Sequence, residues 1–228
     1  MAQVKKYKAE VISILNPIEN IYTVEFKSNS GLFKFLPGQF LHLALDEYDP
    51  SSGWPESRCF SIQSSPNETN LTITYSVKGE FTKRMANEIE TGKVFDLKLP
   101  FGDLFQNNFE KENVVFIAGG TGITPFLSLF ADASFEHFIN AELFFGIRSL
   151  KYNIYSRSLK NAIKINQSFK INIQNEEIDG LLNIDQIYIE NKDKFFFISG
   201  PQLMISNFKE KLILNGVESK KILTDDWN

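Results

Sequence analysis

The sequence predicts a two-domain protein of the β plus α/β class, with an N-terminal six-stranded antiparallel Greek-key barrel and a C-terminal doubly wound parallel sheet. Roughly the first hundred positions have the pattern of short strands at regular spacing, and in places apolar and polar residues alternate cleanly, as in strands with one buried face. After about Asn108, unbroken apolar runs alternate with helical segments, and no repeat or Gly/Ser linker separates the two patterns. We therefore expect one domain at residues 1–108 and a second at 109–228.

The N-terminal half has the pattern of short strands separated by turns. Alternation is clearest in Leu71–Val77, where every second residue is apolar, and Pro37-Gly38 is one of the turn signals. Six strands with one helical insertion at Thr82–Glu90 fit a small antiparallel barrel. The predicted strands span Tyr7–Leu15, Ile21–Lys27, Gln39–Leu45, Arg58–Gln63, Leu71–Val77 and Lys93–Leu99.

The C-terminal half alternates buried strands with helices. Val114–Ala118 is entirely apolar, as expected for a strand that is covered on both faces. Four strand–helix repeats and a closing strand are typical of a doubly wound parallel sheet. The other strands are predicted at Leu143–Phe145, Phe169–Ile173, Phe195–Ile198 and Lys221–Leu223, and the helices from Pro125 and at Tyr155–Lys164, Asn183–Glu190 and Pro201–Leu214.

Composition excludes several classes of protein. Cys59 is the one cysteine among 228 residues, so the chain forms no internal disulfide and holds no iron–sulfur cluster or thiolate zinc site with its own cysteines. With only two histidines, His42 and His137, we expect no metal site. A net charge of −4 argues against a nucleic-acid partner. Without an apolar signal core or a long apolar run, we expect a cytoplasmic protein, not inserted in a membrane, that is a monomer or a weak dimer.

A glycine-rich loop joins the first strand of the C-terminal half to its helix. Its glycines allow a close approach of the backbone to a ligand, and their amides can face a phosphate. Thr124 is expected to cap the helix and Pro125 to fit its first turn. The alternative is a tight turn without a ligand, but the carboxyl edge of such a sheet is where ligands bind, so we favour a dinucleotide. The candidate residues are Gly119, Gly120, Thr121, Gly122, Thr124 and Pro125.

Four further motifs follow in the order and spacing of a known family. Together with the glycine loop, and over nearly the whole chain, they make the sequence resemble the ferredoxin–NADP⁺ reductase family of flavoenzymes. The resemblance implies an FAD-binding barrel followed by an NAD(P)-binding domain, with hydride passing from NADPH or NADH to FAD. The motifs are Arg58–Ser61 (RCFS), Gly79–Thr82 (GEFT), Phe145–Arg148 (FGIR) and Ser199–Pro201 (SGP).

The resemblance also implies an electron acceptor that is a separate molecule, most simply a ferredoxin or flavodoxin, or an oxygenase component. Two alternatives stay open. One is a non-catalytic or regulatory electron-transfer subunit that binds flavin without oxidising nucleotide, and the other is a nucleotide-binding module without flavin.

The family pattern implies roles for the residues of the barrel. Arg58 would bind a flavin phosphate, or else form a surface ion pair. Phe60 stands where the family usually has tyrosine stacked on the isoalloxazine, or else is barrel core. Ser61 would lie near flavin N5. Cys59 is a candidate cofactor-binding residue as part of the same motif, although strand alternation points it away from the face that Arg58 and Phe60 share. In the second motif, Gly79, Phe81 and Thr82 would bind the pyrophosphate, with Thr82 as helix N-cap.

The nucleotide domain carries a run of basic residues where the adenosine 2′-phosphate would lie in the family. From Arg148 to Lys164 there are five basic residues and no acidic one, which favours NADPH over NADH, although a solvated helix face is the alternative. Arg148 and Arg157 are the candidate phosphate ligands.

Two candidate residues belong to the reacting end of the site that the resemblance implies. Ser199 replaces the family's cysteine beside the nicotinamide, followed by Gly200, Pro201 and Met204. Trp227 would stack on the flavin, or else be a frayed or surface residue. The residues expected at the reacting atoms are Ser61, Ser199 and Trp227.

Overall fold

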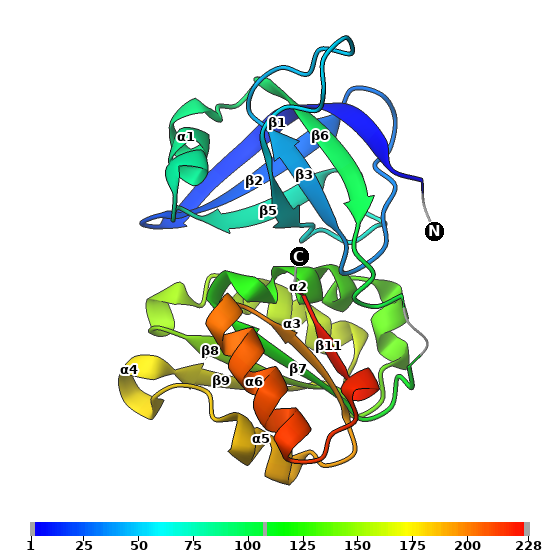
Figure 1. Cartoon of the computed structure of the whole chain (residues 1–228), viewed down its shortest axis with the longest axis vertical. Coiled ribbons are helices and arrows are strands. Elements are labelled where there is room, and N and C mark those ends of the chain that lie inside the picture. Colours follow the sequence, from blue (N-terminus) through cyan, green and yellow to red (C-terminus); the bar gives the residue numbers. More distant parts are fainter. Residues whose placement is uncertain (1–2, 107–108, 226–228) are drawn as a thin grey trace. The chain divides into compact units, whose positions relative to one another are not determined.

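The structure, a computed structural model, describes residues 3–106 and 109–225 (Figure 1). The chain divides into two compact units, Met1–Asp103 and Leu104–Asn228. The domain boundary predicted between residues 108 and 109 falls a few positions later, at the edge of a pair of residues that the structure does not describe.

The first unit is a six-stranded antiparallel sheet with the strand order β4-β3-β6-β1-β2-β5. The ends of the sheet meet, because the amide of Gln63, just after β4, donates to the carbonyl of Thr72 on β5 at 2.8 Å. The predicted antiparallel barrel is therefore confirmed. Its elements are β1 (Lys5–Ile18), β2 (Ile21–Ser28), β3 (Phe40–Ala44), β4 (Ser57–Ser61), β5 (Leu71–Ser76), α1 (Glu80–Glu88) and β6 (Val94–Phe101).

The alternating sequence pattern builds the barrel core. On β5, Leu71, Ile73 and Tyr75 are buried in one apolar cluster, which also takes Val24 and Phe26 from β2. Removing such side chains from water is the main stabilising term for a sheet of this kind. One face of each strand therefore packs into the interior of the barrel, and the other face can carry polar groups.

The second unit is a five-stranded parallel sheet with the order β11-β10-β7-β8-β9, which confirms the doubly wound fold. Its strands are β7 (Val114–Gly119), β8 (Glu142–Ile147), β9 (Lys170–Asn175), β10 (Phe195–Ser199) and β11 (Ile222–Thr224). Its helices are α2 (Thr124–Phe130), α3 (Ser156–Ile165), α4 (Glu176–Asp179), α5 (Ile184–Glu190) and α6 (Gln202–Leu214), with 3₁₀ turns at Gly120–Ile123, Ala133–His137, Leu150–Tyr152 and Ser219–Lys221. The sequence did not predict α4 or these turns.

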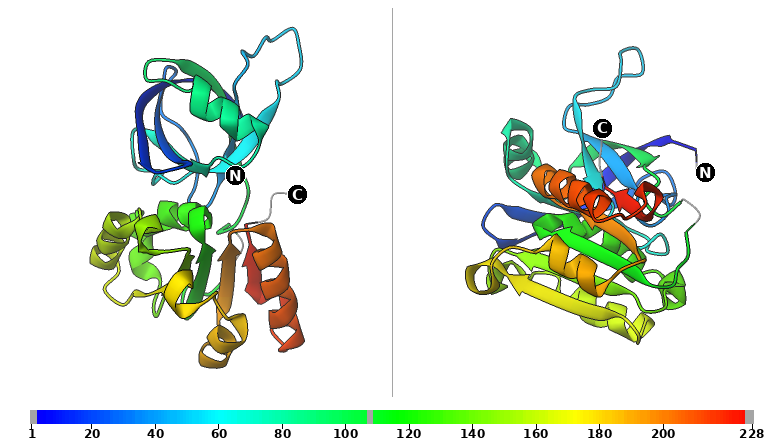
Figure 2. Two further views of the ribbon diagram at one scale, coloured as in Figure 1. Left: turned by 90° about the vertical axis from the view of Figure 1, so that its left-hand side faces the viewer. Right: turned by 60° about the horizontal axis from the view of Figure 1, so that its bottom comes forward.

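Helices cover both faces of this sheet, which explains the unbroken apolar run of β7 (Figure 2). Phe116 packs into the cluster formed with α2 and α3, whereas Val115 and Ile117 pack into the cluster formed with α5 and α6. The first cluster is rich in phenylalanine, and the ring of Phe116 lies 5.0 Å from that of Phe130. Within the described residues, no helix has the length and apolarity that crossing a bilayer requires.

Candidate functional site

Arg58 lies on β4 with its guanidinium held at three points. Its side chain is half-exposed, donates to the carboxylate of Glu56 at 2.8 Å and to the carbonyl of Ser57 at 3.0 Å, and lies 5.1 Å from the ring centroid of Phe81. The Glu56 pair is solvent-exposed, so it contributes little stability, and another anion can replace it at small cost. The guanidinium of Arg58 therefore presents N–H donors to an anion close to the start of α1.

The start of α1 differs from the prediction. Thr82 is not the N-cap; Gly79 holds that position, and Thr82 is the third helical residue. The hydroxyl of Thr82 accepts the amides of Lys78 at 2.9 Å and Gly79 at 3.1 Å, and donates to the carbonyl of Gly79 at 3.0 Å. Because Gly79 has no side chain to cap the helix, Thr82 stiffens the turn, and the amides of the first helical turn stay available to an anion.

The remaining residues of the RCFS motif, Cys59, Phe60 and Ser61, point to alternating faces of β4. Phe60 is 8% exposed and packs edge-to-face on Tyr75, with ring centroids 6.0 Å apart. Phe60 therefore packs against the apolar cluster of the barrel. Ser61 is buried and pairs with Phe40 across β3 and β4. Cys59 pairs with His42 across the same strands, and burial raises the pKa of its thiol while the nearby Arg58 opposes that rise.

In the second unit, the glycine loop follows β7, the strand at which the direction of strand addition in the sheet reverses. The chain leaves β7 towards β8 on one side, and β10 later returns to the other side of β7. Such a switch point opens a crevice at the carboxyl ends of the strands, which is the usual ligand position in this architecture. The loop after β7, residues 119–122, and the loop after β10, residues 199–201, meet there.

The contact between these two loops leaves no room for side chains. A Cβ on Gly122 would lie 2.4 Å from Cα of Gly200, and one on Gly119 would lie 3.0 Å from Sδ of Met204 and from Cδ of Pro201. Gly120 differs, because its φ is +55° and nothing lies within 4 Å of a Cβ placed there. The backbone is therefore close-packed on the side of β10 and open at Gly120.

Thr124 does not cap α2 as predicted. The helix begins at Thr124 itself, with Ile123 in the capping position and Pro125 as the second helical residue. The Thr124 hydroxyl is buried and donates to the carbonyl of Thr121 at 2.9 Å. It therefore braces the loop instead of accepting amides of the helix.

Ser199 ends β10 and has a partner that the sequence did not predict. Its hydroxyl donates to the carboxylate of Asp225 at 3.1 Å, and the Asp225 amide donates to the carbonyl of Ile198 at 3.0 Å. Asp225 follows directly on β11, which pairs with β10, so the sheet brings it beside Ser199. The acidic pair Asp225-Asp226 is visible in the sequence. Only the pairing of β11 with β10 shows that Asp225 lies beside Ser199.

The five basic residues between positions 148 and 164 divide into two groups. Arg148 and Lys151 lie 5.6 and 5.4 Å from the ring centroid of Tyr152, just beyond β8. Arg157, Lys160 and Lys164 are exposed along α3, as the alternative of a solvated helix face expects. Among the ion pairs of residues 3–106 and 109–225, none includes any of the five.

The same segment contains buried polar atoms without partners. Ser149 Oγ and Asn153 Oδ1 make no hydrogen bond within the described part of the chain. Leaving such atoms unsatisfied costs about 1–3 kcal/mol each. Two orphaned polar atoms beside Arg148 and Lys151 fit a segment that completes its hydrogen bonding with a ligand.

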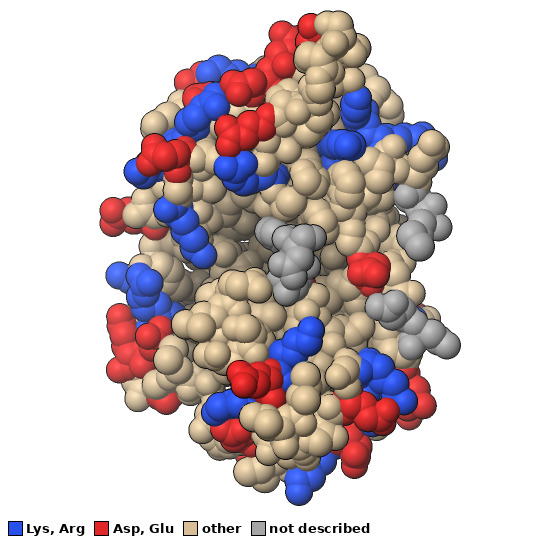
Figure 3. Space-filling model, viewed as in Figure 1, with Lys and Arg blue, Asp and Glu red and all other residues tan. Residues whose placement is uncertain are grey.

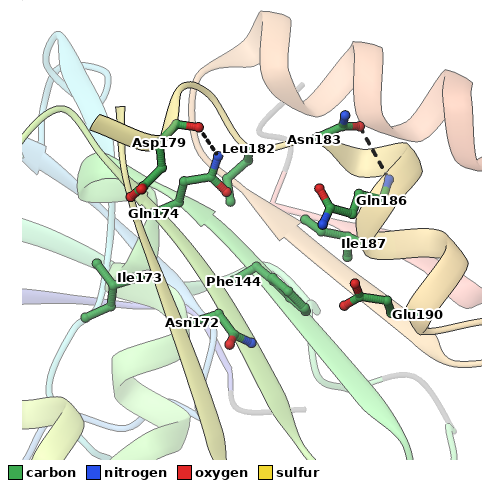
Figure 4. A pocket seen from close by; sticks show the side chains of 10 residues that line it. All are labelled: Phe144, Asn172, Ile173, Gln174, Asp179, Leu182, Asn183, Gln186, Ile187 and Glu190. Atoms are coloured by element: carbon green, nitrogen blue, oxygen red, sulfur yellow. Dashed lines mark hydrogen bonds between the residues drawn. The ribbon is translucent and has the colours of Figure 1, made fainter. Parts of the chain in front are cut away.

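A cavity of about 440 Å³ lies between α5 and the strands β8 and β9 (Figure 4). Its polar lining has four carboxamides and two carboxylates and includes no basic residue, so it suits an anion poorly. None of the predicted site residues lines it, so it is distinct from the crevice at the switch point. The polar residues that line it are Asn172, Gln174, Asn183, Gln186, Asp179 and Glu190.

One predicted site residue, Trp227, lies outside the described residues. The others gather in two places, one in each unit. In the first unit they lie on β4 and at the start of α1. In the second they lie at the ends of β7 and β10, in the segments that follow β7, β8 and β10, and at the start of α2, except Arg157 on α3 and Met204 on α6.

Comparison with protein families matches both units. The model of an FAD-binding domain matches residues 1–129, and the model of an oxidoreductase NAD-binding domain matches residues 116–210. The chain is 31% identical over 147 residues to the glycine betaine monooxygenase reductase subunit of Pseudomonas aeruginosa, covering 62% of this chain and 39% of that protein. It is 23% identical over 217 residues to a flavohemoprotein of Candida norvegensis, covering 93% of this chain and 55% of the relative.

Solved structures share the fold. A ferredoxin NADP⁺ reductase from Neisseria gonorrhoeae with bound FAD and NADP superposes with a TM-score of 0.81 at 16% identity, covering 99% of each chain. The FAD/NAD-binding domain of nitric oxide dioxygenase from Vibrio cholerae superposes with a TM-score of 0.80 at 18% identity, covering 97% of this chain and 98% of that one. The chain thus has the length of these folds but spans only about two fifths to just over half of the curated relatives above.

Proposed function

The chain belongs to the FAD-binding domain family and carries an oxidoreductase NAD-binding domain, and from this premise we propose that it passes hydride from NADPH to FAD and electrons on to a separate protein. Bound FAD supplies the hydride acceptor and releases the electrons singly or as a pair. The protein itself supplies binding, alignment and electrostatics.

The observation that carries the proposal is the pair of loops at the switch point. Gly122 and Gly200 bring two backbone segments together, and the open side of Gly120 leaves room for a ligand against main-chain amides. Backbone amides at the carboxyl edge of a parallel sheet suit a pyrophosphate. We assign this position to the nicotinamide nucleotide, together with Gly119, Thr121, Pro201 and Met204.

In the first unit, we propose that FAD is bound by side chains and by the start of α1. Arg58 takes a phosphate in place of Glu56, with Phe81 limiting the directions its guanidinium can adopt. Thr82 keeps the turn at Gly79 in shape. Phe60, supported by Tyr75, offers a fixed apolar ring to the isoalloxazine, and Ser61 lies beside it on the strand.

Ser199 and Asp225 are proposed to orient the nicotinamide. The Asp225 carboxylate holds the Ser199 hydroxyl in one direction, so that its oxygen presents a lone pair to the bound nucleotide. This small polar group would thus position the nicotinamide.

The preference for NADPH rests on Arg148 and Lys151. Both lie beside Tyr152, neither belongs to an ion pair within the described residues, and Ser149 adds an unsatisfied hydroxyl. A phosphate bound there gains charge-assisted hydrogen bonds that a plain ribose hydroxyl cannot make. Arg157 is the further candidate from α3.

The acceptor is proposed to be an oxygenase component, a ferredoxin or a flavodoxin. The name of one relative, a reductase subunit of a monooxygenase, supports this class. On α1, Lys83 pairs with Glu80, and Arg84 pairs with Asp46 and Glu88. On the face drawn in Figure 3, basic and acidic side chains lie near one another over much of the surface.

The test is the absorbance spectrum of the purified protein, followed by anaerobic addition of NADPH or NADH. We expect a flavin spectrum that NADPH bleaches with a higher kcat/KM than NADH. Bound flavin without bleaching would instead identify a non-catalytic electron-transfer subunit. A colourless protein that does not take up added FAD would identify a nucleotide-binding module without flavin.

A further inference from the structure

The cavity beside α5 lies between one face of that helix and one face of the strands β8 and β9 (Figure 4). Because residues three and four apart share a face of a helix, α5 and its N-cap line the cavity with Asn183, Gln186, Ile187 and Glu190. Its volume of about 440 Å³ is that of a site for a small molecule. The whole lining belongs to the second unit and shares no residue with the glycine loops, so the cavity can take a ligand of its own.

The two carboxamides that β9 contributes use their amide nitrogens within the protein. Gln174 Nε2 donates to the backbone carbonyls of residues 179–181 at 3.3, 3.0 and 2.8 Å, and Asn172 Nδ2 donates to Glu142 Oε1 at 2.8 Å. A carboxamide whose nitrogen is engaged in this way keeps its oxygen as an acceptor. Within residues 3–106 and 109–225, no donor reaches Oε1 of Gln174 or Oδ1 of Asn172, so both oxygens are available to a ligand.

Two carboxylates lie at opposite ends of the cavity. Asp179 lies before the start of α5, whereas Glu190 ends that helix, about 10 Å further along its axis, and extends towards the ring of Phe144 (Figure 4). One oxygen of Asp179 accepts a backbone amide at 3.0 Å, which leaves the other. Among the ion pairs of the described residues, none includes Asp179 or Glu190, and the ammonium of Lys194 is paired with Glu142 at 3.5 Å. The cavity therefore has two negative charges without a positive partner.

We propose that this cavity binds a small aliphatic diamine, with one ammonium group beside Glu190 and Phe144 and the other beside Asp179. An ammonium group has three donors and no acceptor, which matches a lining of carboxylate and carboxamide oxygens, and an aromatic ring beside a cation adds a further attraction. The methylene chain between the two charges packs against Leu182 and Ile187, which belong to the apolar part of the lining. The site has no part in the hydride transfer proposed above.

The test is isothermal titration calorimetry of the purified full-length chain with putrescine, the diamine of butane. Butanediol, which has the same chain length without charge, and succinate, which has the opposite charge, are the matched ligands. We expect one putrescine to bind per chain and neither of the other two to bind. Binding of succinate as tightly as putrescine, or weak binding of several putrescine molecules per chain, would overturn the proposal, because the second result means attraction to an acidic surface in general.

Two substitutions locate the site. Glu190→Gln should weaken putrescine binding by about tenfold or more, since it removes a hydrogen bond to a charged group. Glu177→Gln is the control: it removes the same charge from an exposed residue of α4 that does not line the cavity, and it should leave the affinity unchanged. Gln186→Lys, at an exposed position of α5, places an ammonium group in the cavity and should abolish binding.

Equal losses in Glu190→Gln and Glu177→Gln, or unchanged affinity in Gln186→Lys, would contradict the assignment of the diamine to this cavity. The far-ultraviolet circular dichroism of each variant checks that the fold is kept. None of these readouts depends on flavin or on nucleotide oxidation.

Discussion

The glycines of the two units differ in what their surroundings allow. Gly79, before α1, has extended backbone with φ −141° and nothing within 4 Å of a Cβ placed on it. Gly122 and Gly200, in the second unit, touch backbone to backbone, where a Cβ would lie 2.4 Å from its neighbour. The first turn tolerates a side chain, whereas the second pair of loops does not.

This difference separates two ways of holding a phosphate-bearing cofactor. In the first unit the candidate groups are side chains, chiefly the guanidinium of Arg58, with a half-exposed ion pair that is easily exchanged. In the second unit the candidate surface is main chain brought into place by close packing. Side-chain sites are sensitive to the loss of a functional group, whereas main-chain sites are sensitive to added bulk.

The largest effect is expected from added bulk at Gly122. Gly122→Ala places a methyl against Cα of Gly200, and such overpacking costs about 1–3 kcal/mol, so KM for NADPH should rise by about tenfold or more. Steady-state kinetics and the midpoint of thermal unfolding measure it. Gly53→Ala is the control in the first unit, because nothing lies within 4 Å of a Cβ placed there, and it should change both values little. Equal losses in the two variants would contradict the comparison.

A comparable loss is expected when the first unit loses a side chain. Arg58→Ala removes charge-assisted hydrogen bonds worth about 1.5–3 kcal/mol, so FAD should dissociate at roughly 10–100-fold higher concentration. Equilibrium titration of the apoprotein with FAD measures this. Arg58→Lys, which keeps the charge but not the fork, should recover part of the affinity; full recovery would argue that charge alone matters.

The second unit has one side-chain contribution that can be isolated. Arg148→Ala should lower kcat/KM for NADPH by about tenfold, the value of roughly 1.4 kcal/mol, and change kcat/KM for NADH little. Lys164→Ala, in the last turn of α3, is the control. If both variants lose NADPH activity equally, the five basic residues attract the nucleotide by their summed charge and do not form a specific phosphate site.

The smallest effect is expected at the Ser199–Asp225 pair. Asp225→Asn keeps a hydrogen-bond acceptor but removes the charge, so kcat should fall by a few-fold, corresponding to about 1 kcal/mol for one hydrogen bond. Ser199→Ala removes the hydrogen bond itself and should lower kcat at least as much, and adding Asp225→Asn to Ser199→Ala should cause no further loss, because the carboxylate acts through that one contact. Additive losses would mean that the two residues act separately.

The fold was predictable because the burial of a strand on one or both faces requires a regular pattern of apolar residues in the sequence. Alternation on β5 and the unbroken run of β7 follow directly from one covered face and two covered faces. The helix starts were less predictable. Thr82 and Thr124 have the composition of N-caps, but α1 begins at Glu80 and α2 at Thr124, so each hydroxyl bonds elsewhere.

The site was predictable where its residues are contiguous and not where it depends on pairing between distant strands. The loops after β7 and β10 were found from their glycines. Asp225 reaches Ser199 only because β11 pairs with β10, and His42 reaches Cys59 only through the register of β3 and β4. Such contacts join positions far apart in the chain, and no local pattern records them.

Trp54, which donates its indole N–H to Ser57 near the start of β4, provides an optical probe of the barrel. The only other tryptophan of the chain is Trp227. In a Trp227→Phe background, tryptophan emission therefore arises from the first unit alone, while the far-ultraviolet circular dichroism of the helices is dominated by the second. Comparing the two signals during denaturant unfolding measures whether the first and the second unit unfold in one cooperative transition or in two.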